Sequence, residues 1–375
     1  MKVCISVHGR FHAFELAAGL HRRHALAGLL TTYPGFAVKR LVGASLPTSA
    51  AWWLEMRRRV PGLAIDAAAL ARAFANFAAD HLPDESDLLV GWSSATLEAI
   101  APARGRGMKV ILERGSSHIA HQTEVLSEAY DAYGLQFSET SVAMIEREVA
   151  EYNLADAIAV PSAFAARTFV ARGVPQAKLQ INPYGVDLHR FMPRAGARPD
   201  GPLRILFVGR VGIRKGIPDL LKAFAPLAGD TELHLIGPVD PDMQSILGSA
   251  PLQNVNVRGA LPAAALPGEY AKADIFCLPS LEEGFPLVLL QAMASGLPVV
   301  TTPPSGAEDI LSEGQEGHIV ETGDATALRE VLASLCGDTG ARQRMGAAAR
   351  ARVESGWGWD DYVARAMALY EKLLT

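Results

Sequence analysis

Short apolar runs alternate with longer segments of helical periodicity along most of the chain. We predict a strand at each apolar run and a helix at each amphipathic segment that follows. The strands expected in the first half lie at 2–7, 25–31, 87–92, 108–113 and 157–160, with a helix over 11–24. Those expected in the second half lie at 203–208, 232–236, 254–258, 274–278 and 297–301, with a helix over 218–227. This alternation is typical of α/β folds, in which helices cross over between parallel strands.

One segment interrupts the alternation near the middle of the chain. Residues 192–202 contain three prolines and two glycines among charged residues, which is typical of a linker. We therefore expect an N-terminal α/β domain over 1–190 and a C-terminal one over 200–356, each large enough to bury its own core. Ligands of such folds bind beyond the carboxyl ends of the parallel strands, so we expect the site in the cleft between the two sheets.

The composition is that of a globular protein, but its charge is unevenly distributed. Apolar residues make up 49% and charged residues 20% of the 375, which excludes a disordered or fibrous chain. The net charge of −5 argues against a nucleic-acid binder. Residues 1–60 nevertheless hold nine Lys and Arg against two acids. This is either a solvated basic face or a docking surface for an anionic lipid or acceptor, with Trp52, Trp53 and Arg57–Arg59 on an amphipathic helix.

Cysteine spacing and the length of apolar runs indicate the cellular compartment in which the protein is expected. Cys4, Cys277 and Cys336 form no CxxC pair, so we expect neither a disulfide framework nor a structural zinc site. No apolar run approaches the ~18 residues of a membrane span, and the first apolar stretch is too short for a signal peptide. We therefore expect a cytoplasmic protein, which leaves peripheral contact with the inner face of an anionic membrane open.

The most informative motif is PSLEEGFPLVLLQAMASG, in which a buried strand ends in a turn with two acids and a helix follows. The residues that open the helix are Gly284, Phe285, Pro286, Leu287 and Val288. The free N–H groups of Leu287 and Val288 and the helix dipole form an anion site. Glu283, just ahead of it, would repel a phosphate but can accept hydrogen bonds from the hydroxyls of a sugar. Gln291 follows about two turns on, on the same face.

This stretch resembles the E-x7-E region of the family 4 retaining glycosyltransferases, which have the GT-B fold of two Rossmann-like domains facing a cleft. The resemblance implies that Glu283 holds hydroxyls of the donor sugar and that position 291 binds the ribose of the nucleotide. Here that position is Gln291 and not Glu. A neutral hydrogen bond contributes about 1 kcal/mol where a charge-assisted one contributes roughly 1.5–3, so the nucleotide is held more weakly or in another way.

A second stretch, LRILFVGRVGIRKG, ends a strand at Gly209 and places two cations after it. It is neither a GxGxxG fingerprint nor a P-loop. It resembles the VGR-x4-KG segment of the same family, which implies that Arg210 and Lys215 grip the donor diphosphate. The leaving diphosphate gains negative charge as the bond to the sugar breaks, and fixed cations can stabilise that charge without a metal ion. We therefore expect no metal and no cofactor besides the nucleotide-sugar substrate.

Weaker resemblances concern the N-terminal domain. The family places a histidine near the reacting end of the donor sugar, on a loop after a strand, and His118 in ERGSSH is the best match. Gly9, in the segment HGRFH, lies where the family has a glycine-rich loop facing both substrates. The turn NPYGVD has Tyr184 where the family has Asn. In GT-B enzymes the last helix packs back on the first domain, which predicts that position for 359–375.

The motifs and the resemblance favour a metal-independent retaining glycosyltransferase that moves a sugar from a nucleotide-diphosphate sugar to a hydroxyl of a glycan, a lipid-linked compound or a small molecule. The resemblance implies that attack comes from the face that the leaving diphosphate occupies, with its assistance. The expected catalytic residues are His118, Arg210, Lys215 and Glu283.

Other classes were compared with this one. The alternative that Gln291 suggests is a weakened family member that binds nucleotide-sugar without efficient transfer. A nicotinamide oxidoreductase would need GxGxxG after the first strand, which Val7–Arg10 does not provide. A two-lobed solute-binding protein would need a secretion signal, which the first residues do not resemble. The sugar, the base and the acceptor stay open.

Overall fold

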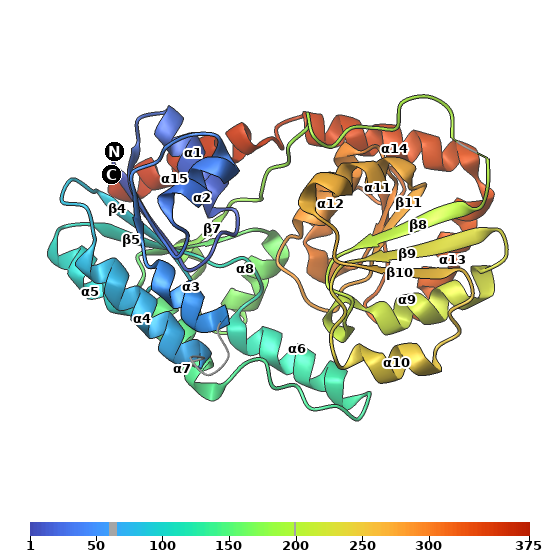
Figure 1. The fold of residues 1–375 in the computed structure, drawn as a ribbon, viewed down its shortest axis with the longest axis horizontal. Coiled ribbons are helices and arrows are strands. Elements are labelled where there is room, and N and C mark those ends of the chain that lie inside the picture. The colour runs from blue at the N-terminus through green and yellow to red at the C-terminus, as the bar shows by residue number, and fades with distance from the viewer. Residues whose placement is uncertain (60–65, 199) are drawn as a thin grey trace.

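Two parallel β-sheets form the centres of two α/β domains that lie side by side (Figure 1). The computed structural model describes residues 1–59, 66–198 and 200–375, with the backbone alone at 58 and 59. Helices cover both faces of each sheet, in the blue-to-green lobe and in the yellow-to-red lobe. This is the doubly wound α/β architecture that the sequence predicts.

The first sheet has seven strands in the order β3-β2-β1-β4-β5-β6-β7, all paired in parallel. They are β1 (Val3–Val7), β2 (Leu26–Thr31), β3 (Thr48–Ala50), β4 (Leu88–Trp92), β5 (Lys109–Glu113), β6 (Ala157–Val160) and β7 (Leu179–Ile181). The predicted strands of this half are confirmed to within a residue at each end. The sequence pattern does not predict β3 and β7, because each has three residues and is partly exposed.

The second sheet has six strands in the order β10-β9-β8-β11-β12-β13, again all parallel. They are β8 (Leu203–Val208), β9 (Thr231–Ile236), β10 (Val255–Gly259), β11 (Ile275–Leu278), β12 (Val299–Thr301) and β13 (Gly317–Ile319), of which the pattern misses only the short β13. In both sheets the strand order reverses beside the first strand of the domain, between β1 and β4 and between β8 and β11. The loops after these strands diverge at the reversal, which opens a crevice at the carboxyl ends.

The crossover helices are amphipathic and pack on sheets whose central strands are buried on both faces. Those of the first domain are α1 (Ala13–Arg22), α2 (Gly35–Val42), α3 (Trp52–Arg59), α4 (Ala67–Asp80), α5 (Leu97–Gly105), α6 (Ile119–Asp131), α7 (Val142–Leu154) and α8 (Ala163–Val170). The others are α9 (Ile217–Phe224), α10 (Met243–Ser249), α11 (Leu266–Lys272), α12 (Leu287–Ala294), α13 (Ala325–Gly337), α14 (Thr339–Glu354) and α15 (Trp359–Leu374). Within the described ranges, none of these helices has the length and apolar character needed to cross a membrane.

The C-terminal helix returns to the first domain, where Figure 1 shows α15 beside α1. Tyr362 and Val363 on α15 are fully buried. Asp360 in its first turn pairs with Arg22 of α1 at 2.7 Å. The last helix of the chain therefore belongs to the core of the domain that the first residues build.

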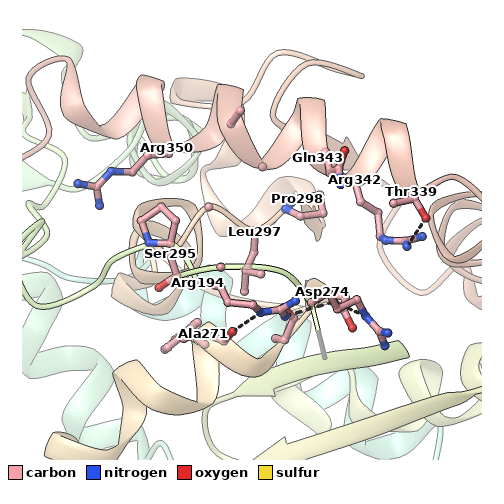
Figure 2. Close-up of a pocket in the computed structure, with 18 of the residues that line it drawn as sticks. Arg194, Ala271, Asp274, Ser295, Leu297, Pro298, Thr339, Arg342, Gln343 and Arg350 are labelled. Carbon is pink, nitrogen blue, oxygen red and sulfur yellow. Dashed lines mark hydrogen bonds and ion pairs between the residues drawn. The ribbon is translucent and has the colours of Figure 1, made fainter. Parts of the chain in front are cut away.

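Arginines fix the linker to the C-terminal domain (Figure 2). Arg194 donates to the backbone carbonyls of Ala271 (2.7 Å) and Ala273 (2.6 Å) at the end of α11, and it pairs with Asp274 at 3.2 Å. Across the same cavity of about 590 Å³, Arg342 donates to carbonyls at the end of α13. Carbonyls at helix ends carry partial negative charge, so these arginines act as caps.

Candidate active site

A cleft of about 590 Å³ lies at the carboxyl ends of both sheets. Its walls are the loops that follow β1, β4 and β5 in the first domain and β8 and β11 in the second. The second domain contributes Gly209, Arg210, Lys215, Glu283, Phe285, Pro286, Leu287 and Val288. The first domain contributes, among others, Phe11, His12, Trp92, Arg114, Ser116 and Tyr184. Most of the residues predicted to bind the donor therefore face one cavity.

The two loops of the second domain come close together because position 216 is glycine. The loop after β8 forms a short 3-10 turn, η2 (Ile213–Lys215), and ends at Gly216 with φ of +66°. A Cβ at Gly216 would lie 1.9 Å from the carbonyl oxygen of Pro279, so any larger residue would push the loops apart. The glycine of the KG pair thus holds Lys215 against the loop after β11.

Two consecutive cations of η2 pair with two consecutive acids of the loop after β11. Arg214 lies 2.7 Å from Glu282, and Lys215 forms an ion pair with Glu283. The Oε1 atom of Glu283 also accepts a hydrogen bond from the Ser280 hydroxyl at 3.2 Å. The cation and the carboxylate that the sequence assigns to different parts of the donor therefore neutralise each other in this structure.

Arg210 supplies a second cation to the same wall. It follows Gly209 at the end of β8 and pairs with Asp240 at 2.7 Å, while its side chain is 59% exposed. The hydrogen bond to Asp240 raises the pKa of Arg210 above its ordinary value, so the guanidinium stays charged at any physiological pH. An anion in the cleft would meet this charge in addition to that of Lys215.

Helix α12 begins at the cleft as the sequence predicts. Pro286 is its N-cap, and no described side chain caps this helix start, which leaves its first N–H groups available to an anion. Gln291, one turn after Leu287, lines a second cavity of about 600 Å³ together with Arg190. Its Oε1 accepts a hydrogen bond from the Tyr270 hydroxyl at 3.1 Å. Since Leu287 lines both cavities, a ligand on α12 can reach from one into the other.

His118 is placed differently from the expectation that it faces the donor sugar. Its Nδ1 accepts the N–H of Ala120 at 3.2 Å and so caps α6, and its ring packs against Tyr152 and Phe169. Burial, with the nearby Arg114, lowers the pKa of His118 to about 4, so the ring is neutral. The described residues that line the cleft do not include His118 but do include two other histidines, His8 and His12.

Gly9 also lies beside the cleft without lining it among the described residues. It follows β1 with φ of +107°, and its carbonyl accepts a hydrogen bond from the Thr31 hydroxyl at 2.9 Å. The glycine therefore shapes the loop that carries Phe11 and His12 into the cleft.

The domains touch where the loop after β5 meets the loop after β11. A Cβ at Gly284 would lie 2.3 Å from the carbonyl oxygen of Gly115, so this crossing requires glycine at 284. The Ser162 hydroxyl donates to the carbonyl of Gly284 at 2.6 Å and adds a second contact from the first domain. Gly284 thus contributes to the domain contact rather than to the wall of the cleft.

Glu282 makes a buried polar contact between the domains. It is 1% exposed and accepts hydrogen bonds from the hydroxyls of Ser116 (2.7 Å) and Ser117 (2.6 Å). Burial opposes its charge, but Arg214 and the two hydroxyls outweigh burial and lower the pKa of Glu282. The two acids are adjacent in sequence, but their side chains have different surroundings. Glu283 lines the cleft, whereas Glu282 bonds to residues of the first domain.

Buried charges on α7 hold the loops of the first domain in place. Glu148 pairs with Arg114 of the cleft wall at 2.8 Å. Glu151 accepts the backbone N–H groups of Ser94 (2.6 Å) and Thr96 (2.8 Å), which fixes the loop after β4. Burial raises the pKa of Glu151 to about 7. Sequence reasoning gave these residues no role, because only the fold shows that α7 lies behind two cleft loops.

The described ranges contain no group of three or more His, Cys, Asp or Glu side chains placed to hold a metal ion. The chemistry that these residues offer is cationic and hydrogen-bonding: two cations and a helix start for an anion, and a carboxylate for hydroxyls.

Comparison with known proteins identifies the family of the chain. Residues 10–190 match the family model described as Glycosyltransferase Family 4, and residues 190–352 match the model described as Glycosyl transferases group 1. The chain belongs to glycosyltransferase family 4. The resemblance drawn from the motifs of the second domain is thereby confirmed for the chain from residue 10 to residue 352.

Curated relatives of this family 4 chain act on several kinds of substrate. Sulfoquinovosyl transferase SQD2 of Arabidopsis thaliana is 32% identical over 219 residues, which are 54% of this chain and 42% of the relative. D-inositol 3-phosphate glycosyltransferase of Arthrobacter sp. is 32% identical over 209 residues, or 51% and 49% of the two chains. The chain spans about half the length of the curated relatives it matches.

Solved structures show the fold of this family 4 chain over its full length. Sucrose-phosphate synthase from Thermosynechococcus elongatus superposes with a TM-score of 0.77 at 21% identity, covering 99% of this chain and 98% of that one. Alr3699/HepE of Anabaena, in complex with UDP-glucose, gives 0.70 at 15% identity, covering 99% and 100%. The predicted GT-B fold is confirmed.

Proposed function

We propose that the chain is a glycosyltransferase that moves a sugar from a nucleotide-diphosphate sugar to a hydroxyl acceptor, with retention of the anomeric configuration and without a metal ion. The observation that carries the proposal is the wall formed by Arg210, the Lys215–Glu283 pair and the start of α12. A diphosphate needs cations and free N–H groups, and a sugar needs a hydrogen-bond acceptor. This wall holds all three within one cavity.

When the donor binds, Lys215 and Glu283 separate and each takes a new partner. The diphosphate takes Lys215 from Glu283, and the freed carboxylate accepts hydrogen bonds from hydroxyls of the sugar. As the bond from the sugar to the diphosphate breaks, Arg210, Lys215 and the dipole of α12 stabilise the charge that develops on the leaving group. These groups can supply such stabilisation without a metal ion.

The nucleoside extends along α12 into the second cavity. The Gln291 amide is placed there to bond a ribose hydroxyl, and its Oε1 already accepts from Tyr270. The side of the cleft formed by the first domain receives the acceptor. Family members named in the comparison above act on different acceptors, so we make no choice of sugar, base or acceptor.

We further propose that the protein sits in the cytoplasm and touches anionic membrane through α2 and α3. Each of these helices carries exposed apolar and basic side chains: Phe36, Lys39 and Arg40 on α2, and Trp52, Trp53, Met56 and Arg57 on α3. Of the predicted basic run, the side chains of 58 and 59 lie outside the described residues. The end of α2 lines the second cavity, so a lipid-linked acceptor on this surface would be beside the cleft.

Thermal-shift screening against UDP, GDP, ADP and their sugars tests the donor, because a ligand that binds the folded state raises its apparent stability. Release of nucleoside diphosphate from the bound sugar nucleotide then separates an enzyme from a protein that only binds. Lys215→Ala should abolish release and leave the fold intact. Full activity in this variant would show that the diphosphate is bound elsewhere.

Sedimentation with vesicles tests the membrane surface. We expect binding to vesicles that contain phosphatidylserine, weakened by salt and by Trp52→Ala with Trp53→Ala, and little binding to phosphatidylcholine alone. Equal recovery in the supernatant with both vesicle types at low salt would remove this part of the proposal and leave the transferase untouched.

A further inference from the structure

Phe11 is an exposed aromatic residue in the turn between β1 and α1. Its side chain is 65% exposed, and among the exposed large apolar residues of the described ranges it alone lines the cleft. A single apolar side chain on an open surface needs no explanation. Inside a cavity, by contrast, the ring offers apolar area that a ligand can cover, so it is a candidate binding surface.

The backbone of Phe11 is strained. Its φ of +42° lies in the left-handed region, which bulky residues rarely adopt. The residues on either side are held in place. Arg10 pairs with Glu15 of α1 at 3.2 Å. His12 is buried, and its ring centroid lies 4.2 Å from that of Tyr184. Strain of this kind persists where the surrounding structure enforces it, and it clusters where ligands bind.

The ring of Phe11 also has a fixed neighbour in the same turn. A Cβ at Gly9 would lie 3.6 Å from Cε2 of Phe11, so the ring rests beside the backbone of this glycine. An aromatic side chain that is held in place before a ligand arrives loses little conformational freedom on binding. The turn therefore presents a preorganised ring to the cleft.

Phe11 lies near the place that the proposed function gives to the diphosphate. Three described residues line both the cleft and the second cavity: Phe11, His12 and Leu287. Leu287 begins α12, at the proposed anion site. A molecule that lies on Phe11 is therefore close to the leaving diphosphate. Retention by attack from the face that the diphosphate occupies requires the acceptor on this side.

The two walls of the cleft differ in charge. Among the Lys, Arg, Asp and Glu side chains of the described lining, the second domain supplies three cations and one acid, and the first domain supplies one of each. Those of the first domain are Arg114 and Glu148, which pair with each other at 2.8 Å. The diphosphate suits the wall of the second domain, and a ligand without net charge suits the wall of the first.

An aromatic face beside small hydroxyl side chains fits a sugar ring. One face of a pyranose carries C–H groups, which are attracted to the electron-rich face of an aromatic ring. The rim of the pyranose carries hydroxyls. Ser93 and Ser94, which also line the cleft, can both donate hydrogen bonds to such groups and accept them. An acyclic polyol offers no such face, and a phosphate would need a cation that is not already paired.

We propose that Phe11 is the platform on which a neutral pyranose ring of the acceptor stacks; this rests on the proposed transferase function and names the acceptor class for it. The stacked ring presents its hydroxyl to the anomeric carbon from the side of the diphosphate. Phe11 exchanges no proton and no electron pair with the substrates. It is a positioning residue that sets where the acceptor lies.

Saturation-transfer NMR tests the platform without knowledge of the natural acceptor. The probes are the methyl pyranosides of glucose, galactose, mannose and N-acetylglucosamine, with glycerol and glycerol 3-phosphate for comparison. We expect transfer to the ring C–H protons of a pyranoside, with a Kd that rises roughly 3- to 12-fold in Phe11→Ala. Phe11→Trp should retain binding. Val142→Ala, which shortens a side chain that is 70% exposed on α7, should behave as wild type.

The binding data overturn the proposal in three cases: no pyranoside binds wild type, glycerol 3-phosphate alone binds, or Phe11→Ala leaves the Kd unchanged. Phe11→Gly guards against a folding defect. Glycine adopts a positive φ without strain, so this variant should keep at least the Tm of Phe11→Ala while binding the pyranoside as weakly. A Tm far below both wild type and Phe11→Ala would show that the ring serves the fold, and it would overturn the proposal.

Kinetics separate the acceptor from the donor. With the bound pyranoside as acceptor, Phe11→Ala should raise the acceptor KM by the same factor as the Kd. The donor KM and the hydrolysis of the sugar nucleotide by water should stay within about twofold of wild type. A donor KM that rises as much as the acceptor KM would overturn the proposal, because the ring would then serve the donor. If wild type binds a pyranoside through Phe11 but neither binds nor cleaves a sugar nucleotide, the sugar platform stands and the proposed function fails.

Discussion

Replacement of Glu282 by alanine should loosen the contact between the two domains. The carboxylate belongs to the second domain and accepts hydrogen bonds from Ser116, Ser117 and Gln122 of the first, the last at 3.1 Å. Within its own domain it pairs with Arg214 at 2.7 Å. The alanine variant removes a carboxylate that is 1% exposed and leaves all four partners without the charge that orders them.

The structure sets the size of the effect. A hydrogen bond to a charged group contributes about 1.5–3 kcal/mol, and removing one partner of a buried ion pair costs about 3–5 kcal/mol. Arg214 is 31% exposed, and the serine hydroxyls regain water when the domains part, so part of this cost is recovered. We expect a net loss of about 2–4 kcal/mol, which is roughly a 30- to 700-fold shift of the equilibrium between closed and open domains.

Glu308→Gln provides a matched control. Glu308 also reaches the other domain, where Arg167 lies at 2.5 Å, but the two side chains are 38% and 58% exposed. An exposed pair of this kind contributes about 0–1 kcal/mol. Small-angle scattering should show a larger radius of gyration for Glu282→Ala than for wild type, and no change for Glu308→Gln. Identical scattering from both variants would refute the reasoning that burial makes Glu282 the main contact.

Three further changes have defined outcomes. Gln291→Glu should tighten UDP binding by up to about tenfold in calorimetry, since a charged acceptor replaces a neutral one; an unchanged Kd would contradict the ribose assignment. Gly284→Ala should lower Tm in thermal scans, because its Cβ would lie 2.3 Å from Gly115, whereas Gly229→Ala meets nothing within 4 Å. Acid should open the wild-type domains: the folded pKa of Glu282 is depressed, so its contribution is complete above the ordinary value of about 4.3 and is lost as pH falls below it. Glu282→Ala should lack that component.

Periodicity in the sequence predicts most of the fold. Parallel strands buried on both faces leave near-continuous apolar runs, and those runs locate nearly every long strand to within two residues. The strands that it misses are β3, β7 and β13, where three residues pair at or near a sheet edge and are partly exposed. Their positions depend on the neighbouring strand, which a local pattern does not contain.

The sequence predicts residues of the cleft where a single motif contains both the turn and the functional side chains. Gly209, Lys215 and Glu283 lie on loops whose glycines and prolines are local in sequence, so their convergence follows from the strands that precede them. The histidine is where the prediction differs from the structure. His118 caps a helix, and His12 lines the cleft because Tyr184 and α15, which lie far along the chain, pack around it. Local sequence does not tell which of the loop histidines point into the cleft.

The paired cations and acids of the second domain divide two tasks between neighbouring residues. Arg214 and Glu282 bind each other and the first domain, so their pairing keeps the two loops and the two domains in register. Lys215 and Glu283, one residue later, bind each other, and Glu283 also accepts a hydrogen bond from Ser280 of the same domain. A donor can therefore replace the second pair while the first holds the geometry. In the function that we propose, this arrangement preorganises the charges that a leaving diphosphate needs and confines the rearrangement on binding to two side chains.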